Sequence, residues 1–143
     1  MTVAHILASK GRDVVTARSD STITDIARTL AEHGIGAVVI TGEARNVLGI
    51  VSERDIVRAV ATTGAAALQE RVDRHMTTRV TLGSESMTVT QAMEHMTHGR
   101  FRHLPIAEEG RLIGLVSIGD IVKHRLAQIE SESQAMREYI ATA

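Results

Sequence analysis

Cysteine and tryptophan are absent from this sequence of 143 residues, and proline, phenylalanine and tyrosine each occur once. Without cysteine the chain cannot form disulfides, thiolate metal sites or a cysteine nucleophile. Because aromatic side chains are so few, the core must be built from Val, Ile, Leu, Ala and Met. A chain of this length fits one compact domain, or two small ones that share a core.

A large excess of charge is also missing. The formal net charge is -1 and the pI is about 6.7, so the chain lacks the basic field that drives sequence-independent nucleic-acid binding. No apolar run approaches the roughly 18 residues that span a bilayer, and the N-terminus has no secretory-signal pattern. We therefore expect a soluble, cytoplasmic protein with no nucleic-acid partner and no membrane insertion.

An internal repeat is present instead. The stretch Gly49–Ile56 (GIVSERDI) returns at Gly114–Ile121 (GLVSIGDI), 65 residues later. Upstream of it, Thr22–Ile40 aligns with Thr88–Ile106 at an offset of 66 residues. The change of one residue falls in a stretch rich in turn residues, where insertions and deletions are tolerated best. The chain therefore consists of two copies of one unit.

Each copy begins with an amphipathic helix. Apolar residues recur at the helical spacing of three and four positions in both copies. Thr22 with Asp25, and Thr88 with Gln91, match the capping box that starts a helix, and Gly34 and Gly99 mark the expected helix ends. The apolar positions are Ile23, Ile26, Ala27, Leu30 and Ala31 in the first copy and Val89, Ala92, Met93 and Met96 in the second.

A hairpin and a second helix follow in each copy. Two apolar runs separated by turn residues predict the hairpins, and Pro105, which cannot donate a backbone hydrogen bond, places its strand at a sheet edge. Short strands around Val14–Val15 and Val80 are expected before the first helices. The predicted hairpin strands are 37–40 with 47–51 and 104–106 with 112–116, and the second helices begin near Glu53 and Ile118.

The predicted fold class is therefore α/β (α+β), with two tandem β-α-β-β-α repeats related by a pseudo-twofold axis and an extended C-terminal helix. The expected boundaries are residues 1–62 for the first repeat and 75–127 for the second. Residues 63–74 connect the repeats, and their Ala-rich middle predicts a helical or compact segment. Residues 128–143 form the helical extension.

The C-terminal helix has more apolar positions than one repeat needs. Over Gly119–Ile140 apolar residues follow a heptad spacing in which Ser133 is the one polar position. A second subunit that covers this face, giving a homodimer, is one interpretation. A helix folded back on its own domain is the other. The spaced apolar residues are Val122, Leu126, Ile129, Met136 and Tyr139 or Ile140.

The repeated Ser-x-x-Asp pattern stands where a buried strand runs into a helix. Unpaired N–H groups at a helix N-terminus attract anions, so Ser52 with Asp55 and Ser117 with Asp120 are candidate binding residues. The same spacing matches a capping box, so these residues could also do no more than start a helix.

The duplicated pattern, together with FRHLPI at 101–106, resembles the CBS domain in its usual tandem pair, over roughly residues 3–127. The resemblance implies two clefts between the repeats that bind adenosine-containing ligands. AMP is the first choice, and NAD, ADP, ATP or S-adenosylmethionine are alternatives. It also implies a regulatory module for energy or redox sensing that acts on an unknown target protein in trans.

The resemblance also assigns residues. Asp55 and Asp120 would accept hydrogen bonds from ribose hydroxyls, and Ser52 and Ser117 would contact phosphate. A carboxylate is well suited to a cis-diol because it only accepts hydrogen bonds. Arg102 and His103 occupy phosphate-contacting positions, Val15 and Val80 would touch the adenine, and Gly36 and Ala37 would line the opposite wall.

The two copies differ in their cationic residues. Arg54 of the first copy corresponds to Gly119 of the second, so two sites of unequal affinity or ligand preference are expected. Arg12, Lys10 and Arg58 are more simply interpreted as solvated surface charges than as phosphate ligands.

No catalytic residues and no metal site are expected, because the seven histidines lack an HExxH motif and an acidic cluster. The alternative function is a constitutive dimerisation or scaffold module without a physiological ligand.

Overall fold

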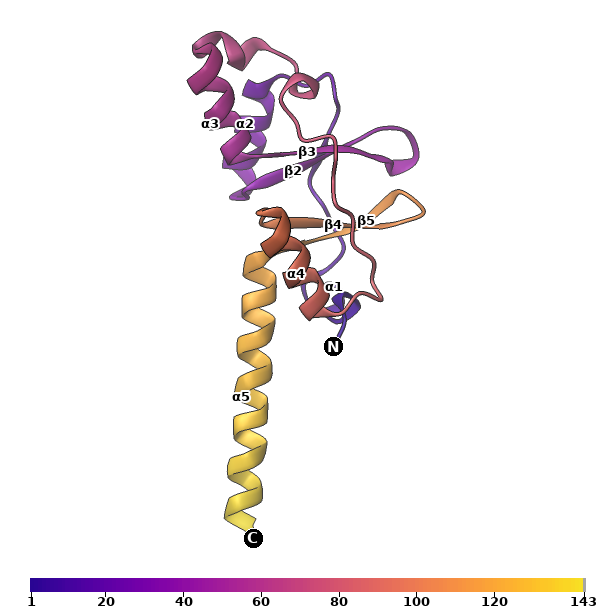
Figure 1. The fold of residues 1–143 in the computed structure, drawn as a ribbon, viewed down its shortest axis with the longest axis vertical. Helices are drawn as coiled ribbons and strands as arrows, with labels where there is room; N and C mark the ends of the chain where they lie inside the picture. Colours follow the sequence, from indigo (N-terminus) through magenta and orange to yellow (C-terminus); the bar gives the residue numbers. More distant parts are fainter. Residues whose placement is uncertain (143) are drawn as a thin grey trace.

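Two hairpins, one from each half of the chain, form the centre of the structure, a computed structural model that describes residues 1–142. Strand β2 (Ala37–Thr41) pairs antiparallel with β3 (Val47–Ser52) and parallel with the short β1 (Thr16–Ala17). Strand β4 (His103–Glu108) pairs antiparallel with β5 (Arg111–Ser117). The helices are α1 (Val3–Lys10), α2 (Ile23–His33), α3 (Glu53–Thr63), α4 (Val89–Gly99) and α5 (Ile118–Thr142), with 3-10 turns η1 (Glu43–Arg45), η2 (Ala65–Gln69) and η3 (Val72–Arg74) (Figure 1).

The predicted helix starts are confirmed. The Thr22 hydroxyl accepts a hydrogen bond from Asp25 N at 3.1 Å, and the Thr88 hydroxyl accepts one from Gln91 N at 3.0 Å. Gly34 ends α2 in the left-handed conformation. The end of α4 differs by one residue from the prediction, because Arg100, rather than Gly99, adopts the left-handed conformation after the last helical turn.

The short strands before the first helices were predicted in the wrong place. Strand β1 lies one residue beyond Val15, and Val80 lies in a loop. The counterpart of β1 in the second repeat is a single bridge between Gly83 and Ile106. A Cβ at Gly83 would lie 2.8 Å from Ile106 Cδ1, so any larger residue here would force the buried Ile106 side chain to shift.

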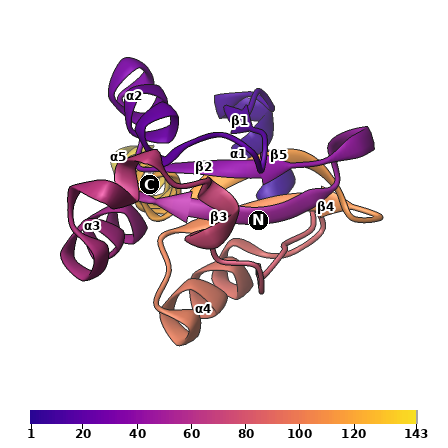
Figure 2. The same cartoon turned by 90° about the horizontal axis from the view of Figure 1, so that it is seen from above.

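The turns of the two hairpins hold the repeats together through reciprocal contacts. Arg45 Nε donates to the carbonyl of Leu112, and Arg111 Nε donates to the carbonyl of Ala44, both at 3.2 Å. Such a matched exchange is expected when two copies of one unit face each other. The view in Figure 2 shows β2 and β3 lying over β4 and β5, which confirms the predicted arrangement of two repeats.

Each sheet has its own buried core, but the residues of each core do not all come from one half of the chain. The N-terminal helix α1, which the sequence analysis did not predict, packs into the core of the second repeat. The first core contains Ile23, Ile26, Leu30, Val38, Ile40, Val51 and Val72. The second contains Val3, Ile6, Leu7, Val89, Ala92, Met96, Leu104, Ile106, Val116 and Ile121.

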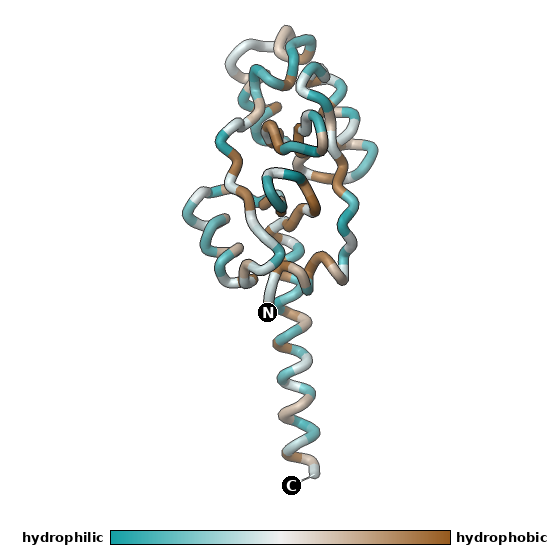
Figure 3. The backbone as a smooth tube through the Cα atoms, turned by 90° about the vertical axis from the view of Figure 1, so that its right-hand side faces the viewer, coloured by the Kyte–Doolittle hydropathy of each residue, from teal (hydrophilic) through white to brown (hydrophobic). Residues whose placement is uncertain are grey.

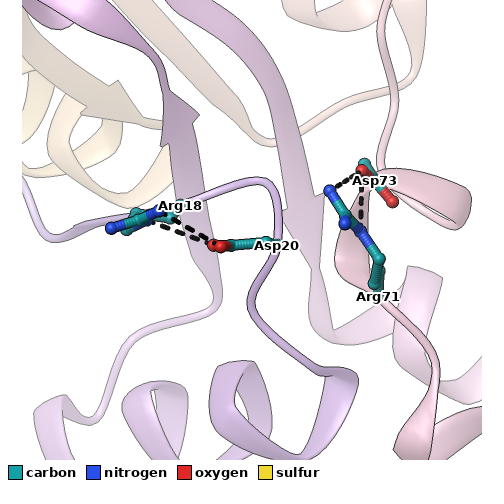
Figure 4. A network of polar contacts seen from close by, with 4 residues as sticks. All are labelled: Arg18, Asp20, Arg71 and Asp73. Carbon is teal, nitrogen blue, oxygen red and sulfur yellow. Dashed lines mark hydrogen bonds and ion pairs between the residues drawn. The ribbon is translucent and has the colours of Figure 1, made fainter.

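The connecting segment is compact, as predicted. Its η2 and η3 turns pack against the first repeat, and Val72 N donates to the carbonyl of Ser21 at 2.7 Å. Figure 4 shows an ion pair on each of the two segments joined here, Arg18 with Asp20 and Arg71 with Asp73. Because these pairs are local and largely exposed, we ascribe the docking to the backbone contact and to buried Val72 rather than to the charges.

The C-terminal helix is continuous, and it extends away from the two repeats (Figure 1). The prediction of one long helix is confirmed. The interpretation in which it folds back on its own domain is wrong, because its apolar side chains are exposed. The exposed fractions are Val122 51%, Leu126 56%, Ile129 55%, Met136 59%, Tyr139 72% and Ile140 66%.

Candidate functional site

A cleft of about 920 Å³ lies between the repeats, at the junction of β3 and α3. Elements distant in sequence meet in it: the start of α3, the loop before α4 and the loop between α4 and β4. Eight of the eleven residues that the sequence associates with the site line this cleft. They are Gly36, Ala37, Ser52, Arg54, Asp55, Val80, Arg102 and His103.

Ser52 and Asp55 form the capping box of α3. Asp55 Oδ2 accepts hydrogen bonds from Ser52 N at 2.8 Å and from Ser52 Oγ at 3.1 Å. Within residues 1–142, no hydrogen bond reaches Asp55 Oδ1. The cap therefore uses one carboxylate oxygen and leaves the other able to accept a hydrogen bond in the cleft. Asp55 can therefore cap the helix with one oxygen and bind a ligand with the other, so the two interpretations of the motif are compatible.

Arginine side chains dominate the charge of this cleft. Five line it, and in the described part of the chain none of them forms an ion pair with a carboxylate. Only Glu53 and Asp55 contribute negative charge to the lining. Because positive side chains outnumber negative ones in this lining, the cleft attracts anions. The five, hereafter the arginine cluster, are Arg54, Arg58, Arg79, Arg100 and Arg102.

Sequence reasoning missed part of this cluster. Arg79 and Arg100 were not singled out. Arg58, interpreted as a solvated surface charge, is exposed and also lines the cleft. A smaller hollow of about 310 Å³ beside α4 shares Arg54, Arg100 and Arg102 with the cleft. The cationic surface thus continues past the cleft. Position along one repeat could not reveal it, because the five side chains come from three separate segments.

His103 lines the cleft and is half-buried at the start of β4. Its ring carbon Cε1 would lie 3.3 Å from a Cβ built on Gly36, so the absence of a side chain there makes room for the imidazole. Burial lowers the pKa of His103, and Lys10 and Arg102 act in the same direction. Asp120 and Glu53 oppose this shift. The net direction favours the neutral ring at pH 7.

The second Ser-x-x-Asp motif has a different environment. Asp120 Oδ2 accepts a hydrogen bond from Ser117 N at 2.8 Å, and Lys10 Nζ contacts the same oxygen at 2.6 Å. Lys10 also donates to the carbonyl of Leu115 at 2.8 Å. Burial raises the pKa of Asp120, but the hydrogen bonds from Lys10 and Ser117 outweigh it, and the net pKa is lowered.

These contacts separate the predicted site residues into two groups. Ser117 and Asp120 lie at the start of α5 and do not line the arginine-rich cleft, and Val15 lies just before β1. Lys10, which had been interpreted as a surface charge, instead neutralises Asp120. Arg12 pairs with Glu85. The predicted difference between the two sites therefore extends beyond Arg54 to an internal cation at the second carboxylate.

The described residues provide no other obvious ligand set. Among residues 1–142, no group of three or more His, Asp or Glu side chains could hold a metal ion. In the same range, no helix has the length and apolarity that crossing a membrane requires.

Comparison with known proteins gives the same family from sequence and from structure. The family model described as "CBS domain" matches twice, at residues 3–62 and 71–127. The crystal structure of a CBS-domain containing protein from Agrobacterium tumefaciens superposes with a TM-score of 0.84 at 52% sequence identity. That alignment covers 87% of this chain and 99% of the other.

Two further relatives bear on location and ligand. A mitochondrial CBS domain-containing protein of Arabidopsis thaliana is 31% identical, over 97% of this chain and 71% of its own length. Since this relative is described as mitochondrial, the family includes proteins outside the cytoplasm, and the cytoplasmic location expected for this chain stays a prediction. A CBS domain protein from Pyrobaculum aerophilum complexed with AMP is 28% identical, with a TM-score of 0.74, over 84% of this chain and 89% of the other.

Proposed function

The chain belongs to the CBS domain family, and we propose that it is a regulatory module that binds an adenosine nucleotide in the arginine-rich cleft and acts on a target protein in trans. In this proposal it has no catalytic role. A ligand shifts such a module between two conformations only by the difference in its affinity for them. The alternative, a constitutive scaffold, would leave the cleft without a physiological ligand.

One observation carries the proposal: a single cleft contains a carboxylate oxygen that accepts no hydrogen bond and five arginines that form no ion pair with any of residues 1–142. Asp55 Oδ1 suits a ribose diol, because an ionised carboxylate only accepts hydrogen bonds. Guanidinium groups bind phosphate oxygens through paired hydrogen bonds. Val80, which is half-buried, offers apolar surface for a purine ring. The AMP complex of the Pyrobaculum relative supports the same ligand class.

The charge of the cleft also ranks the ligands expected from the sequence. AMP, ADP, ATP and NAD carry negative phosphates, whereas S-adenosylmethionine carries a positive sulfonium and no phosphate. Bringing that cation beside the arginine cluster is unfavourable, since like charges repel. We therefore propose an anionic adenosine nucleotide, with energy or redox state as the quantity sensed.

A thermal-shift panel tests this function. At 100 times the dissociation constant, an anionic nucleotide should stabilise the fold by about 2.7 kcal/mol, while S-adenosylmethionine at the same concentration leaves the melting temperature unchanged. If neither kind of ligand stabilises the protein, the scaffold alternative holds. Stabilisation by S-adenosylmethionine alone would contradict the assignment of an anionic ligand.

Protonation of His103 should accompany nucleotide binding. The free ring has a lowered pKa and is neutral at pH 7. A phosphate group nearby stabilises the charged imidazolium and raises that pKa. Binding at about pH 6 should therefore take up protons, and the affinity should increase as the pH falls from 8 to 6. Calorimetry in buffers of different ionisation enthalpy measures the uptake directly.

The variant His103→Gln separates this effect from titration of the nucleotide phosphate itself. Glutamine retains a polar side chain but cannot ionise in this range. The pH dependence that remains in the variant belongs to the ligand, and the difference from the unmodified protein belongs to His103. Equal proton uptake by the two proteins would show that no phosphate lies near His103.

A further inference from the structure

Apolar residues recur along the whole exposed length of α5, between hydrophilic ones (Figure 3). They occupy the a and d positions of a heptad with spacings of four and three residues. Each is at least half exposed, so the chain's own domain does not cover them. The a positions are Leu126, Ser133 and Ile140, and the d positions are Val122, Ile129 and Met136.

This seam points away from the body of the protein. From Ile121 to the end of α5, the residues that are buried or half-buried, Ile121, His124 and Gln128, lie on the side that packs against the second repeat. At 3.6 residues per turn, the centre of the seam lies roughly 130° around the helix from that side. A second helix can therefore lie along the seam without displacing any contact within the domain.

Charges beside the seam indicate which partner and which orientation fit. In a parallel coiled coil, a g residue faces the e residue that follows it by five positions on the other helix. Arg125 then faces Glu130, and Glu132 faces Arg137. Two-fold symmetry doubles these pairs, so all four contacts join opposite charges. The polar Ser133 meets its own copy and not an apolar side chain.

An antiparallel pair with the same apolar layers is disfavoured by the same residues. If Val122 packed against Ile140 of the other copy, each e position would lie beside an e position of the other helix, and each g position beside a g position. Glu130 and Glu132 would each face their own copies, and Lys123 would face Arg137. Like charges at these positions are destabilising. Ser133 would also face the apolar Ile129.

We propose that residues 122–140 pair with a second copy of this chain as a parallel, in-register coiled coil, which places both nucleotide-binding bodies at the same end of a shared stalk. The pairing does not require nucleotide, so a failure of the proposed ligand to bind would not contradict it, and the absence of a dimer would not contradict nucleotide binding. It also identifies the partner for the apolar face as a second copy, as expected for a homodimer.

Because the chain has no cysteine, single cysteine variants test the orientation cleanly. Ile140→Cys should form a disulfide-linked dimer under mild oxidation in a parallel pair. In the antiparallel arrangement the two cysteines would be about 27 Å apart along the axis, at ~1.5 Å per residue. Glu138→Cys, on the outer face of the same turn, is the matched control and should stay largely uncrosslinked. Failure of Ile140→Cys to crosslink would overturn the proposal.

Charge variants provide a second test that leaves the seam intact. Glu132→Lys replaces two attractive contacts with repulsive ones and should weaken the dimer roughly tenfold in analytical ultracentrifugation. Adding Arg137→Glu reverses both partners and should restore most of the affinity. A double variant no better than the single one would overturn the pairing of Glu132 with Arg137.

Discussion

Replacing Leu7 with Ala should lower the free energy of unfolding by about 2–5 kcal/mol, the usual cost of removing a buried leucine side chain. Leu7 is 1% exposed and belongs to the core of the second repeat. Its methyl groups lie against Gly114, where a Cβ would be 2.8 Å from Leu7 Cδ1. No other large side chain can move in from that position, so a cavity remains.

A loss of this size is a large part of the 5–15 kcal/mol that stabilises a typical domain. The melting temperature should fall by roughly 5–20 °C for a chain of this length. Urea unfolding, followed by circular dichroism, measures the change. Ser9→Ala, an exposed substitution on the same helix, should leave stability within about 0.5 kcal/mol. If Leu7→Ala unfolds like the unmodified protein, α1 does not contribute to the core.

The role of α1 illustrates what local sequence patterns do not determine. Periodicity and capping residues predicted α2, α4 and both hairpins, because the signals for those elements lie within each repeat. Val3, Ile6 and Leu7 have helical spacing and could have predicted α1 itself. Which core the helix joins depends on contacts across about 100 residues, and a repeat alignment contains no such information.

In the candidate site too, local motifs could be predicted from the sequence, whereas contacts between distant segments could not. Asp55 and Ser52 were identifiable as candidates because the repeated motif that contains them is only four residues long, and the family resemblance then implied their ligand roles. The arginine cluster was identifiable only in part, since its members come from α3 and two separate loops. The pairing of Lys10 with Asp120 also joins distant segments. Sequence reasoning thus found the carboxylates but underestimated the charge around one and missed the cation beside the other.

Asp55→Asn should weaken nucleotide binding tenfold or more, the largest effect expected for a single substitution in the cleft. A charge-assisted hydrogen bond contributes about 1.5–3 kcal/mol, and about 1.4 kcal/mol corresponds to a factor of ten. Asparagine keeps an oxygen that can accept from Ser52 N, so the helix cap and the fold should remain. Isothermal titration calorimetry, with a melting curve to confirm folding, measures the loss.

Asp120→Asn is the matched control at the corresponding position of the second repeat. There Lys10 contacts Oδ2, the oxygen that also serves the helix cap, and its charge neutralises the carboxylate, so a ribose hydroxyl at the other oxygen would meet a weaker acceptor than at Asp55. We expect less than a threefold change in nucleotide affinity, together with at most about 1 kcal/mol of lost stability, since the ion pair is partly exposed. Equal losses of affinity in the two variants would show that the two carboxylates play the same part.

The variant Lys10→Met tests whether the Lys10 ammonium group is the reason that the two Ser-x-x-Asp motifs differ in nucleotide binding. Removing the ammonium group leaves Asp120 with its cap from Ser117 and without a neutralising partner, which makes it resemble Asp55. If Lys10 suppresses a second site, the variant should show a second binding event that the unmodified protein lacks. If binding stays at the stoichiometry of the unmodified protein, the arginine cluster, rather than Lys10, decides where the nucleotide binds.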